Sequence, residues 1–302
     1  MSGAQPQARP GGGAAPLVVF SHGNSFPAST YGVLFASLQA RGFEVRAIEK
    51  FGHDPRYPVT SNWPHLVQQL ADFAGLEVEQ SGRPAFLVGH SLGGFLSLMC
   101  AALHPRLGGQ KVAGVVLIDS PIVGGWRAKA LSVAKRARLV GSISPGAISR
   151  RRRQQWLSRE EVLAHFRSKK VFARWDEQVL RDYIDHGTHD THDTHDTQDG
   201  QGTPQGQRLL SFDREVETAI YNTLPDNLGT LLKNHPLQCP AAFIGGRDSA
   251  EMKQMGMALT RQVTQGRIMM LDGSHLFPME QPLATAAAIE AALLNLMHLA
   301  GR

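Results

Sequence analysis

The stretch of this 302-residue chain that most limits its fold is Gly89-His90-Ser91-Leu92-Gly93. It follows an apolar run at residues 85–88 and precedes a helical pattern at residues 95–103. A serine between glycines, placed between a strand and a helix, is the G-x-S-x-G pattern, whose tight turn lifts the hydroxyl clear of the sheet. A helix that begins directly after the serine directs its free N–H groups and positive dipole end toward that hydroxyl. The pattern therefore makes Ser91 a candidate nucleophile.

Short apolar runs alternate with helical patterns on both sides of this stretch. Runs buried on both faces are typical of parallel strands, and the alternation predicts a mostly parallel central sheet flanked by helices. The expected strands are residues 16–20, 43–48, 85–88, 112–118, 241–244 and 267–271, and the main helical patterns are residues 31–40, 63–80, 95–103 and 282–299. His22, Ser91 and Asp119 each follow a strand directly. In such sheets, functional groups gather at the carboxyl ends of the strands.

The alternation stops between residues 122 and 235, so we expect an insertion there. The predicted organisation is a disordered leader at residues 1–15, a core at residues 16–121 and 236–302, and a helical cap at residues 122–235 inserted before the last strands. The leader is rich in Gly, Ala, Pro and Gln and lacks the apolar segment of a secretory signal.

The predicted cap is strongly basic. Residues 126–140 form an amphipathic helical pattern, and residues 150–153 are four consecutive arginines. Arg167, Lys169, Lys170 and Arg174 follow on a second basic helix. One interpretation is a lid that makes weak peripheral contact with anionic lipid head groups or attracts an acidic acyl donor. The simpler interpretation, which we favour, is a solvated positive face.

A His-Asp-Thr repeat lies inside the predicted cap, and Gln/Gly-rich residues follow it, over about residues 186–207. Clustered histidines and aspartates can bind metal ions. A metal site needs ligands held at fixed geometry, and this tract is poor in helix formers. We therefore expect a disordered segment here and no metal site.

Two further strand ends supply partners for the serine. A serine hydroxyl needs a base to remove its proton, and that base needs a carboxylate to fix its tautomer. His275 follows the last strand and Asp248 follows the strand before it, so Ser91, Asp248 and His275 stand in the chain order nucleophile, acid, base. Asp119, which follows an earlier strand, is the alternative acid.

The turn after the first strand is a candidate for binding a developing negative charge. It contains His22-Gly23-Asn24-Ser25, and a glycine-containing loop can direct its N–H groups toward an oxyanion. The expected donors are the N–H of Leu92 and that of Asn24 or Ser25. The alternative is an ordinary strand-to-helix loop in which Ser29 or Thr30 caps the next helix.

These pieces together resemble an α/β-hydrolase of the lipase and esterase type with a cap domain. The matching segments are residues 22–23, 89–93, 245–248, 273–275 and 280–282. The resemblance implies the α/β-hydrolase fold, with Ser91 as nucleophile, His275 as base and Asp248 as acid. It favours Asp248 over Asp119, although some relatives, among them haloalkane dehalogenases, place the acid where Asp119 stands. Dehalogenases and epoxide hydrolases attack with an aspartate, so Ser91 sets both apart from this chain.

The expected activity is hydrolysis of a small-molecule carboxylic ester, lipid or other, through an acyl-enzyme on Ser91. Thioester hydrolysis, C–C bond hydrolysis and peroxyacid formation use the same residues and stay open. A rival from another class is a catalytically silent binding protein on the same fold. We expect no cofactor and no nucleic-acid partner, and nothing in the sequence predicts an oligomeric state. The two cysteines lack metal or redox spacing and suit a reducing compartment, so we expect a cytoplasmic location.

Overall fold

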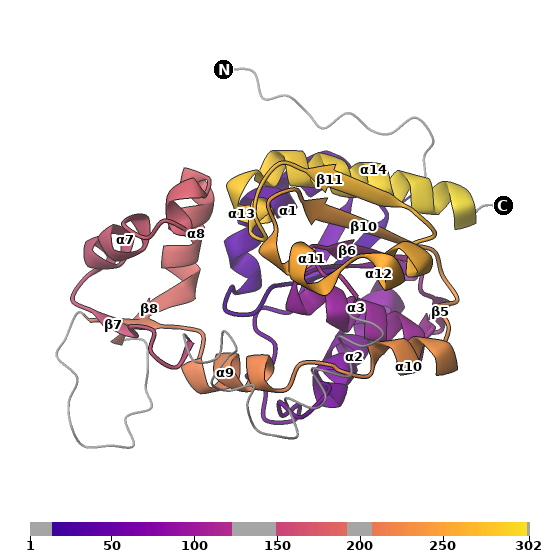
Figure 1. Cartoon of the computed structure of the whole chain (residues 1–302), viewed down its shortest axis with the longest axis horizontal. Helices are drawn as coiled ribbons and strands as arrows, with labels where there is room; N and C mark the ends of the chain where they lie inside the picture. Colours follow the sequence, from indigo (N-terminus) through magenta and orange to yellow (C-terminus); the bar gives the residue numbers. More distant parts are fainter. Residues whose placement is uncertain (1–13, 123–148, 192–206, 301–302) are drawn as a thin grey trace.

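A parallel sheet of six strands forms the centre of the computed structural model, which describes residues 14–122, 149–191 and 207–300 (Figure 1). The strand order is β11-β10-β6-β3-β1-β2, and every neighbouring pair is parallel. The strands are β1 (Leu17–Ser21), β2 (Glu44–Ala47), β3 (Ala85–His90), β6 (Gly114–Ile118), β10 (Ala241–Gly246) and β11 (Ile268–Leu271). The expected sheet is thus confirmed.

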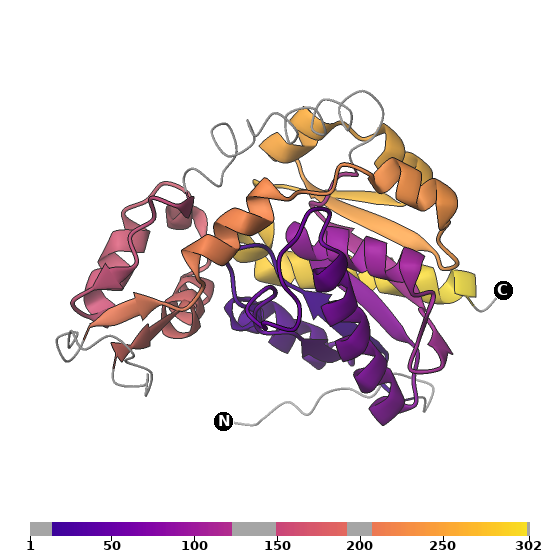
Figure 2. The same cartoon turned by 90° about the horizontal axis from the view of Figure 1, so that it is seen from below.

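Helices cover both faces of this sheet (Figures 1 and 2). One face packs against α1 (Gly32–Ala40) and α14 (Pro282–Ala300), and the other against α2 (Pro64–Ser81) and α3 (Leu92–Leu103). Alternate strand residues serve the two faces because successive side chains of a strand point in opposite directions. In β1, for example, Val18 and Phe20 join the first cluster, whereas Leu17 and Val19 join the second.

Shorter elements complete the core. They are η1 (Ala28–Tyr31), β4 (Arg106–Leu107), β5 (Gln110–Lys111), α11 (Ala250–Met255), α12 (Ala258–Val263) and α13 (Phe277–Glu280). Strands β4 and β5 form a small antiparallel hairpin. The segment between β10 and β11 contains two short helices, α11 and α12, because Gly256 at a positive φ of 74° ends the first of them.

Residues 149–191 of the inserted segment lie to one side of the sheet, whereas residues 214–234 run back below the core (Figure 1). The elements of this segment are β7 (Gln155–Trp156), α7 (Arg159–Arg167), η2 (Phe172–Arg174), α8 (Glu177–Gly187), β8 (Thr188–Asp190), β9 (Arg208–Leu210), α9 (Arg214–Asn222) and α10 (Leu228–Asn234). We call residues 149–191 and 207–235 the cap. Three of its elements pair as an antiparallel sheet in the order β7-β9-β8. The described cap thus contains helices, as expected, together with a small sheet that was not predicted.

The His-Asp-Thr tract differs from expectation at its beginning. Residues 186–187 end α8, and Thr188–Asp190 form β8, which pairs with β9. Arg208 stabilises this strand because its guanidinium donates to the carbonyl oxygens of Ile184 and Thr188, both at 3.0 Å. Residues 186–191 are thus structured, contrary to the prediction of disorder. The rest of the tract, residues 192–206, lies outside the described residues, as does the amphipathic pattern at residues 126–140.

One described helix, α14, is long and apolar enough to cross a bilayer by length and composition alone. In this structure it is a core helix, since Ala286, Ile289, Leu293 and Leu296 are completely buried against the sheet. Burial in the protein core explains its apolar composition.

Candidate active site

Ser91 lies on a strained turn between β3 and α3. Its backbone has φ 53° and ψ −117°, a region that residues with a side chain rarely occupy. The neighbouring glycines permit the turn: a Cβ on Gly89 would lie 2.1 Å from the carbonyl oxygen of Gly93, and one on Gly93 would lie 2.0 Å from that of Ser21. The Ser120 hydroxyl also donates to the Ser91 carbonyl oxygen at 2.8 Å. The sequence pattern thus produces the expected tight turn.

His275 connects Ser91 to a carboxylate. Its Nε2 lies 2.9 Å from the Ser91 hydroxyl, and its Nδ1 lies 2.6 Å from Oδ2 of Asp119. The carboxylate can only accept, so Nδ1 carries the proton and Nε2 is free to accept from the serine. The Asp119 side chain is completely buried, and its oxygens also accept from the Gly246 N–H at 2.8 Å and the Ser249 hydroxyl at 2.5 Å. These bonds fix the orientation of the carboxylate.

Asp119, and not Asp248, is the carboxylate that contacts Nδ1 of His275. The Asp248 side chain is 66% exposed, and it faces Arg174 at 3.9 Å. The prediction of Asp248 as the partner of His275 is therefore wrong, and the alternative acid, Asp119, occupies that position. A physical reason lies in the backbone of Asp119. Its φ is positive, at 46°, directly after the end of β6, and with this conformation its side chain contacts His275. Strands β6 and β10 are neighbours in the sheet, so their carboxyl ends lie close together.

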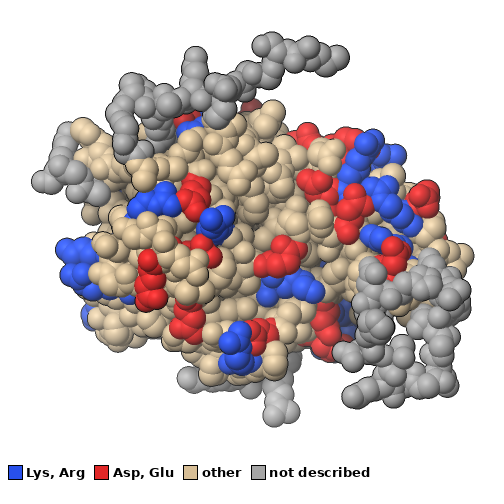
Figure 3. Space-filling view, turned by 180° about the vertical axis from the view of Figure 1, so that it is seen from behind, with Lys and Arg blue, Asp and Glu red and all other residues tan. Residues whose placement is uncertain are grey.

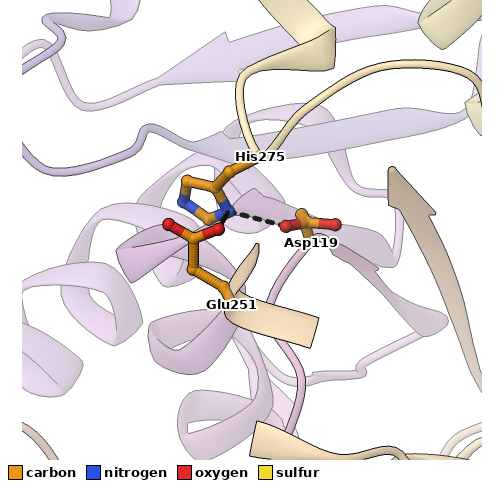
Figure 4. Close-up of side chains that lie close together, drawn as sticks. All are labelled: Asp119, Glu251 and His275. Atoms are coloured by element: carbon orange, nitrogen blue, oxygen red, sulfur yellow. Dashed lines mark hydrogen bonds and ion pairs between the residues drawn. The ribbon is translucent and has the colours of Figure 1, made fainter. Parts of the chain in front are cut away.

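A second carboxylate lies beside this pair. Oε2 of Glu251, on α11, is 3.8 Å from Nδ1 of His275, so that His275 lies near both acids (Figure 4). Burial lowers the pKa of His275, but the hydrogen bond to Asp119 and the charges of Glu251 and Asp119 more than offset burial, and the pKa is raised. The protonated imidazolium is thus stabilised, as a general base requires after it takes a proton.

The same three residues are close enough to be considered as metal ligands. One donor atom from each of Asp119, Glu251 and His275 lies within 4.8 Å of the others. The hydrogen bond between Asp119 and His275 already uses the facing atoms of that pair, while Nε2 of His275 faces Ser91. This arrangement suits proton transfer from a serine better than metal ligation.

Of the predicted oxyanion donors, Leu92 directly follows Ser91, and Asn24 and Ser25 lie on the loop after β1. No hydrogen bond within the described part of the chain uses the backbone N–H of Asn24, Ser25 or Leu92. The Gly23 N–H, by contrast, donates to the Tyr31 hydroxyl at 2.9 Å. Asn24 lines the cavity that contains Ser91 and His275, and its side-chain amide donates to the Glu217 carbonyl oxygen of α9 at 3.1 Å. The N–H groups of Asn24, Ser25 and Leu92 thus have no acceptor among the described residues, and of Asn24 and Ser25 only Asn24 lines the cavity.

A cavity of about 360 Å³ surrounds Ser91 and His275. Its size is within the range of small-molecule sites. The core supplies the apolar Phe26 and Leu276 together with the two acidic side chains Asp248 and Glu251. The cap supplies Val171 and Tyr221, so both parts of the chain form the wall. Burial raises the pKa of Tyr221 to about 12, and its hydroxyl therefore keeps its proton at neutral pH.

A larger cavity, of about 710 Å³, lies between α10, α12 and the beginning of β10. Its lining includes Leu232, Gln262 and Arg267 and none of the candidate site residues. We therefore assign the chemistry to the smaller cavity.

Glu280 stabilises the loop that carries His275. Its side chain is only 5% exposed and accepts from the Ser274 hydroxyl at 2.5 Å and the Ser274 N–H at 3.1 Å. Arg174 of the cap forms an ion pair with the same carboxylate at 3.1 Å. Glu280 was part of the matching segment in the sequence, but its contact with Ser274 was not predicted. No local pattern indicates it, because the contact depends on how α13 folds back on the loop.

Acidic neighbours pair with several of the cap's positive charges. Arg153 contacts Glu161, Arg159 contacts Asp185, and Arg167 contacts Glu177. In the view from behind, basic and acidic side chains lie next to each other on the cap side of the molecule (Figure 3). Such pairing reduces the attraction of this surface for anions, and it favours the interpretation of a solvated, mixed face. Membrane contact through the cap stays a prediction.

Comparison with known proteins gives a consistent match. A model described as the alpha/beta hydrolase family matches residues 18–288. The crystal structure of an E-2-(acetamidomethylene)succinate hydrolase is similar to this chain, with a TM-score of 0.65 and 21% sequence identity. The match covers 93% of this chain and 92% of the hydrolase. A peroxisomal alpha-beta-hydrolase from Saccharomyces cerevisiae is 17% identical, with a TM-score of 0.64 and coverage of 96% and 80%. The enol-lactonase from Burkholderia xenovorans LB400 is 20% identical, with a TM-score of 0.54 and coverage of 93% and 92%. No curated protein sequence matches the chain.

Proposed function

Because this chain belongs to the alpha/beta hydrolase family, we propose that it is a serine hydrolase that cleaves a small-molecule carboxylic ester through an acyl-enzyme on Ser91. The observation that carries the proposal is the chain of hydrogen bonds from the Ser91 hydroxyl to Nε2 of His275, at 2.9 Å, and from Nδ1 to Asp119, at 2.6 Å. In this proposal Ser91 is the nucleophile, His275 the general base and Asp119 the acid.

The proposed reaction has two halves. His275 takes the Ser91 proton as the oxygen attacks the ester carbonyl, and the imidazolium then returns that proton to the leaving alcohol. The tetrahedral oxyanion accepts hydrogen bonds from the N–H groups of Leu92 and Asn24. Water, deprotonated by His275, attacks the acyl-enzyme, releases the carboxylic acid and restores Ser91. Asp119 holds the Nδ1–H tautomer throughout and stabilises the imidazolium.

The cavity supports a small acyl group as the substrate part nearest Ser91. Phe26, Val171 and Leu276 offer an apolar surface, whereas the acidic residues Asp248 and Glu251 line the same cavity. We therefore propose an uncharged acyl group rather than an acidic one, because a carboxylate beside these acids is disfavoured. Thioester, C–C bond and peroxyacid chemistry would use the same three residues. A lipid ester would have to fit its acyl chain into the same cavity of about 360 Å³.

We also propose a cytoplasmic location. The support for it is chemical: Cys100 and Cys239 are both free thiols in the structure, as in a reducing compartment.

The test of the proposal is a series of p-nitrophenyl esters from acetate to palmitate, with acyl thioesters measured in parallel. Wild type, Ser91→Ala and Ser81→Ala are compared, the last being a serine outside the cavity at the end of α2. We expect turnover that falls steeply from short to long acyl chains, retention in Ser81→Ala and loss in Ser91→Ala. Turnover that survives in Ser91→Ala would overturn the role of this serine, and thioester turnover alone would change the substrate class. No turnover of any substrate, together with no reaction at Ser91, would favour the silent binding protein.

A further inference from the structure

A chain of buried hydrogen bonds joins the oxyanion loop to the loop of His275. The Gly23 N–H donates to the Tyr31 hydroxyl at 2.9 Å, and that hydroxyl lies 2.8 Å from Nδ1 of His90. Nε2 of His90 lies 2.9 Å from the backbone carbonyl oxygen of His275. His90 and Tyr31 are 0% and 2% exposed, so no water competes for these groups at the surface.

The chemistry of the partners fixes the direction of every bond in this chain. A carbonyl oxygen can only accept, so Nε2 of His90 must carry a proton and donate to His275. In a neutral imidazole the other nitrogen is then an acceptor, and the Tyr31 hydroxyl donates to it. The tyrosine oxygen in turn accepts from Gly23. Each donor therefore has one acceptor, and the arrangement requires a neutral His90 with the proton on Nε2.

The surroundings of His90 favour that neutral form. Burial and the nearby His275 lower the pKa of His90 to about 3, with a smaller lowering from His22. The bond to the His275 carbonyl and the charge of Asp119 act in the opposite direction but do not offset burial. Burial also raises the pKa of Tyr31, so its hydroxyl remains a donor. Both groups keep the required protonation states at neutral pH.

The location of His90 indicates what these hydrogen bonds do. His90 directly precedes Ser91, and its ring lies beside that of His275, with the centroids 5.1 Å apart. Gly23 directly precedes Asn24, and a Cβ on Gly23 would lie only 3.0 Å from Nδ1 of His90. One imidazole thus contacts the segments that carry the serine, the base and the oxyanion donor.

We propose that His90 and Tyr31 are positioning residues that hold the His275 imidazole and the Asn24 N–H at a fixed separation across Ser91. Tyr31 does not line the cavity and His90 does, but the proposed role of both is to hold these two groups in place. Their effect is on the transition state, because an error of about 1 Å in such an arrangement can reduce the rate about 100-fold. This inference rests on the proposed serine chemistry at Ser91.

The first test is Tyr31→Phe, which removes only the hydroxyl. We expect kcat to fall about 10- to 100-fold with a KM close to that of wild type, because the ground-state pocket is intact. A trifluoromethyl ketone, which forms an oxyanion when Ser91 adds to it, should bind more weakly by the same factor as kcat/KM falls. A purely structural role would reduce thermal stability without this proportionality. Full kcat in a folded Tyr31→Phe protein would overturn the proposal.

Two replacements of His90 separate its two contacts. His90→Gln can place an amide N–H near the position of Nε2 and donate to His275, whereas His90→Leu can make neither bond. We expect His90→Gln to retain more of kcat than His90→Leu, with unchanged KM in both. Equal kcat in the two variants, both near wild type, would contradict the proposal.

A measurement on the unmodified protein keeps the proposal testable if these variants fail to fold. Nitrogen NMR of labelled histidines should show His90 neutral, with the proton on Nε2, at pH 6. An imidazolium at His90, or a proton on Nδ1, would overturn the hydrogen-bond chain whether or not any ester is hydrolysed. Failure of the proposed function would appear separately, as a wild-type protein that does not react at Ser91.

Discussion

The carboxylate of Asp119 lies 2.6 Å from Nδ1 of His275, and it is completely buried at the end of β6. Every oxygen of this carboxylate has a donor, because the Gly246 N–H and the Ser249 hydroxyl bind it as well. Asp248 follows the neighbouring strand but lies at the surface. The candidate base is therefore oriented from β6 rather than from β10.

A pair of substitutions tests this assignment. Asp119→Asn keeps the shape of the side chain but replaces an acceptor with an amide and favours the wrong tautomer of His275, so we expect kcat to fall about 10⁴-fold. Asp248→Asn should change kcat less than about threefold, because this side chain makes no hydrogen bond to His275. Steady-state kinetics of both variants on the same ester checks the prediction. The reverse ranking would restore Asp248 as the acid.

The charge of Glu251 should affect how activity depends on pH. The charge of Glu251 helps to raise the pKa of His275, and a base must be neutral to accept the Ser91 proton. Activity should therefore rise with pH through the pKa of His275, and Glu251→Gln should move this rise to lower pH. Asp248→Asn is the matched control, since it neutralises another acid of the same cavity without contact to His275. Equal shifts of kcat/KM in both variants would contradict the specific role of Glu251.

Because His22 and His90 are buried and neutral, we expect the protein to lose stability in mild acid. Burial lowers the pKa of His22 to about 4 and that of His90 to about 3, from an ordinary value of 6.5. Below that ordinary value the unfolded chain binds protons that the folded chain does not, so the free energy of unfolding falls as pH falls from about 6.5 toward about 4. Each histidine contributes a slope of up to about 1.4 kcal/mol per pH unit in this window.

His22→Gln tests the slope directly. Glutamine can accept from the Phe51 N–H, as Nε2 of His22 does at 2.9 Å, but it does not titrate. Denaturant unfolding between pH 4.5 and 8 should give a smaller slope for the variant below about pH 6.5 and parallel curves above about pH 7.5. An unchanged slope in the acid range would show that His22 is not held neutral.

Glu280 should matter for both stability and activity. Glu280→Ala leaves the Ser274 N–H and hydroxyl without their acceptor, so we expect a loss of about 1–3 kcal/mol in the free energy of unfolding and a lower kcat. Glu290→Ala is the control, because Glu290 forms a partly exposed ion pair with Arg41, worth about 0–1 kcal/mol, and does not line the cavity. Equal effects of the two substitutions on kcat would contradict a role of Glu280 in holding the His275 loop.

The fold could be predicted from the sequence because its signals are local. Apolar runs mark the strands and the glycines on both sides of Ser91 mark the tight turn, so both features are visible in short stretches of sequence. Ser91 and His275 could be paired for the same reason, since both follow strands whose ends meet at one edge of the sheet. The likeness to solved structures extends over almost the whole chain.

The remaining features depend on contacts between distant segments. Asp119 and Asp248 both follow strands, and no local pattern indicates which of the two carboxylates reaches His275. The cap sheet was missed because β7 and β9 are too short for a period of two to appear, and they pair across more than fifty residues. Tyr31 resembled an ordinary apolar helix residue, so its bond to His90 had no signal in the sequence.

The most direct test of the whole account is the rate at which a fluorophosphonate labels Ser91, located by mass spectrometry of the digested protein. We predict one label, on Ser91, in wild type and in Asp248→Asn, a far slower reaction in Asp119→Asn and none in Ser91→Ala. Rapid labelling shows that His275 and Asp119 activate this hydroxyl, whatever ester the protein cleaves. A wild-type protein that leaves Ser91 unlabelled, or equal rates in wild type and Asp119→Asn, would contradict the account.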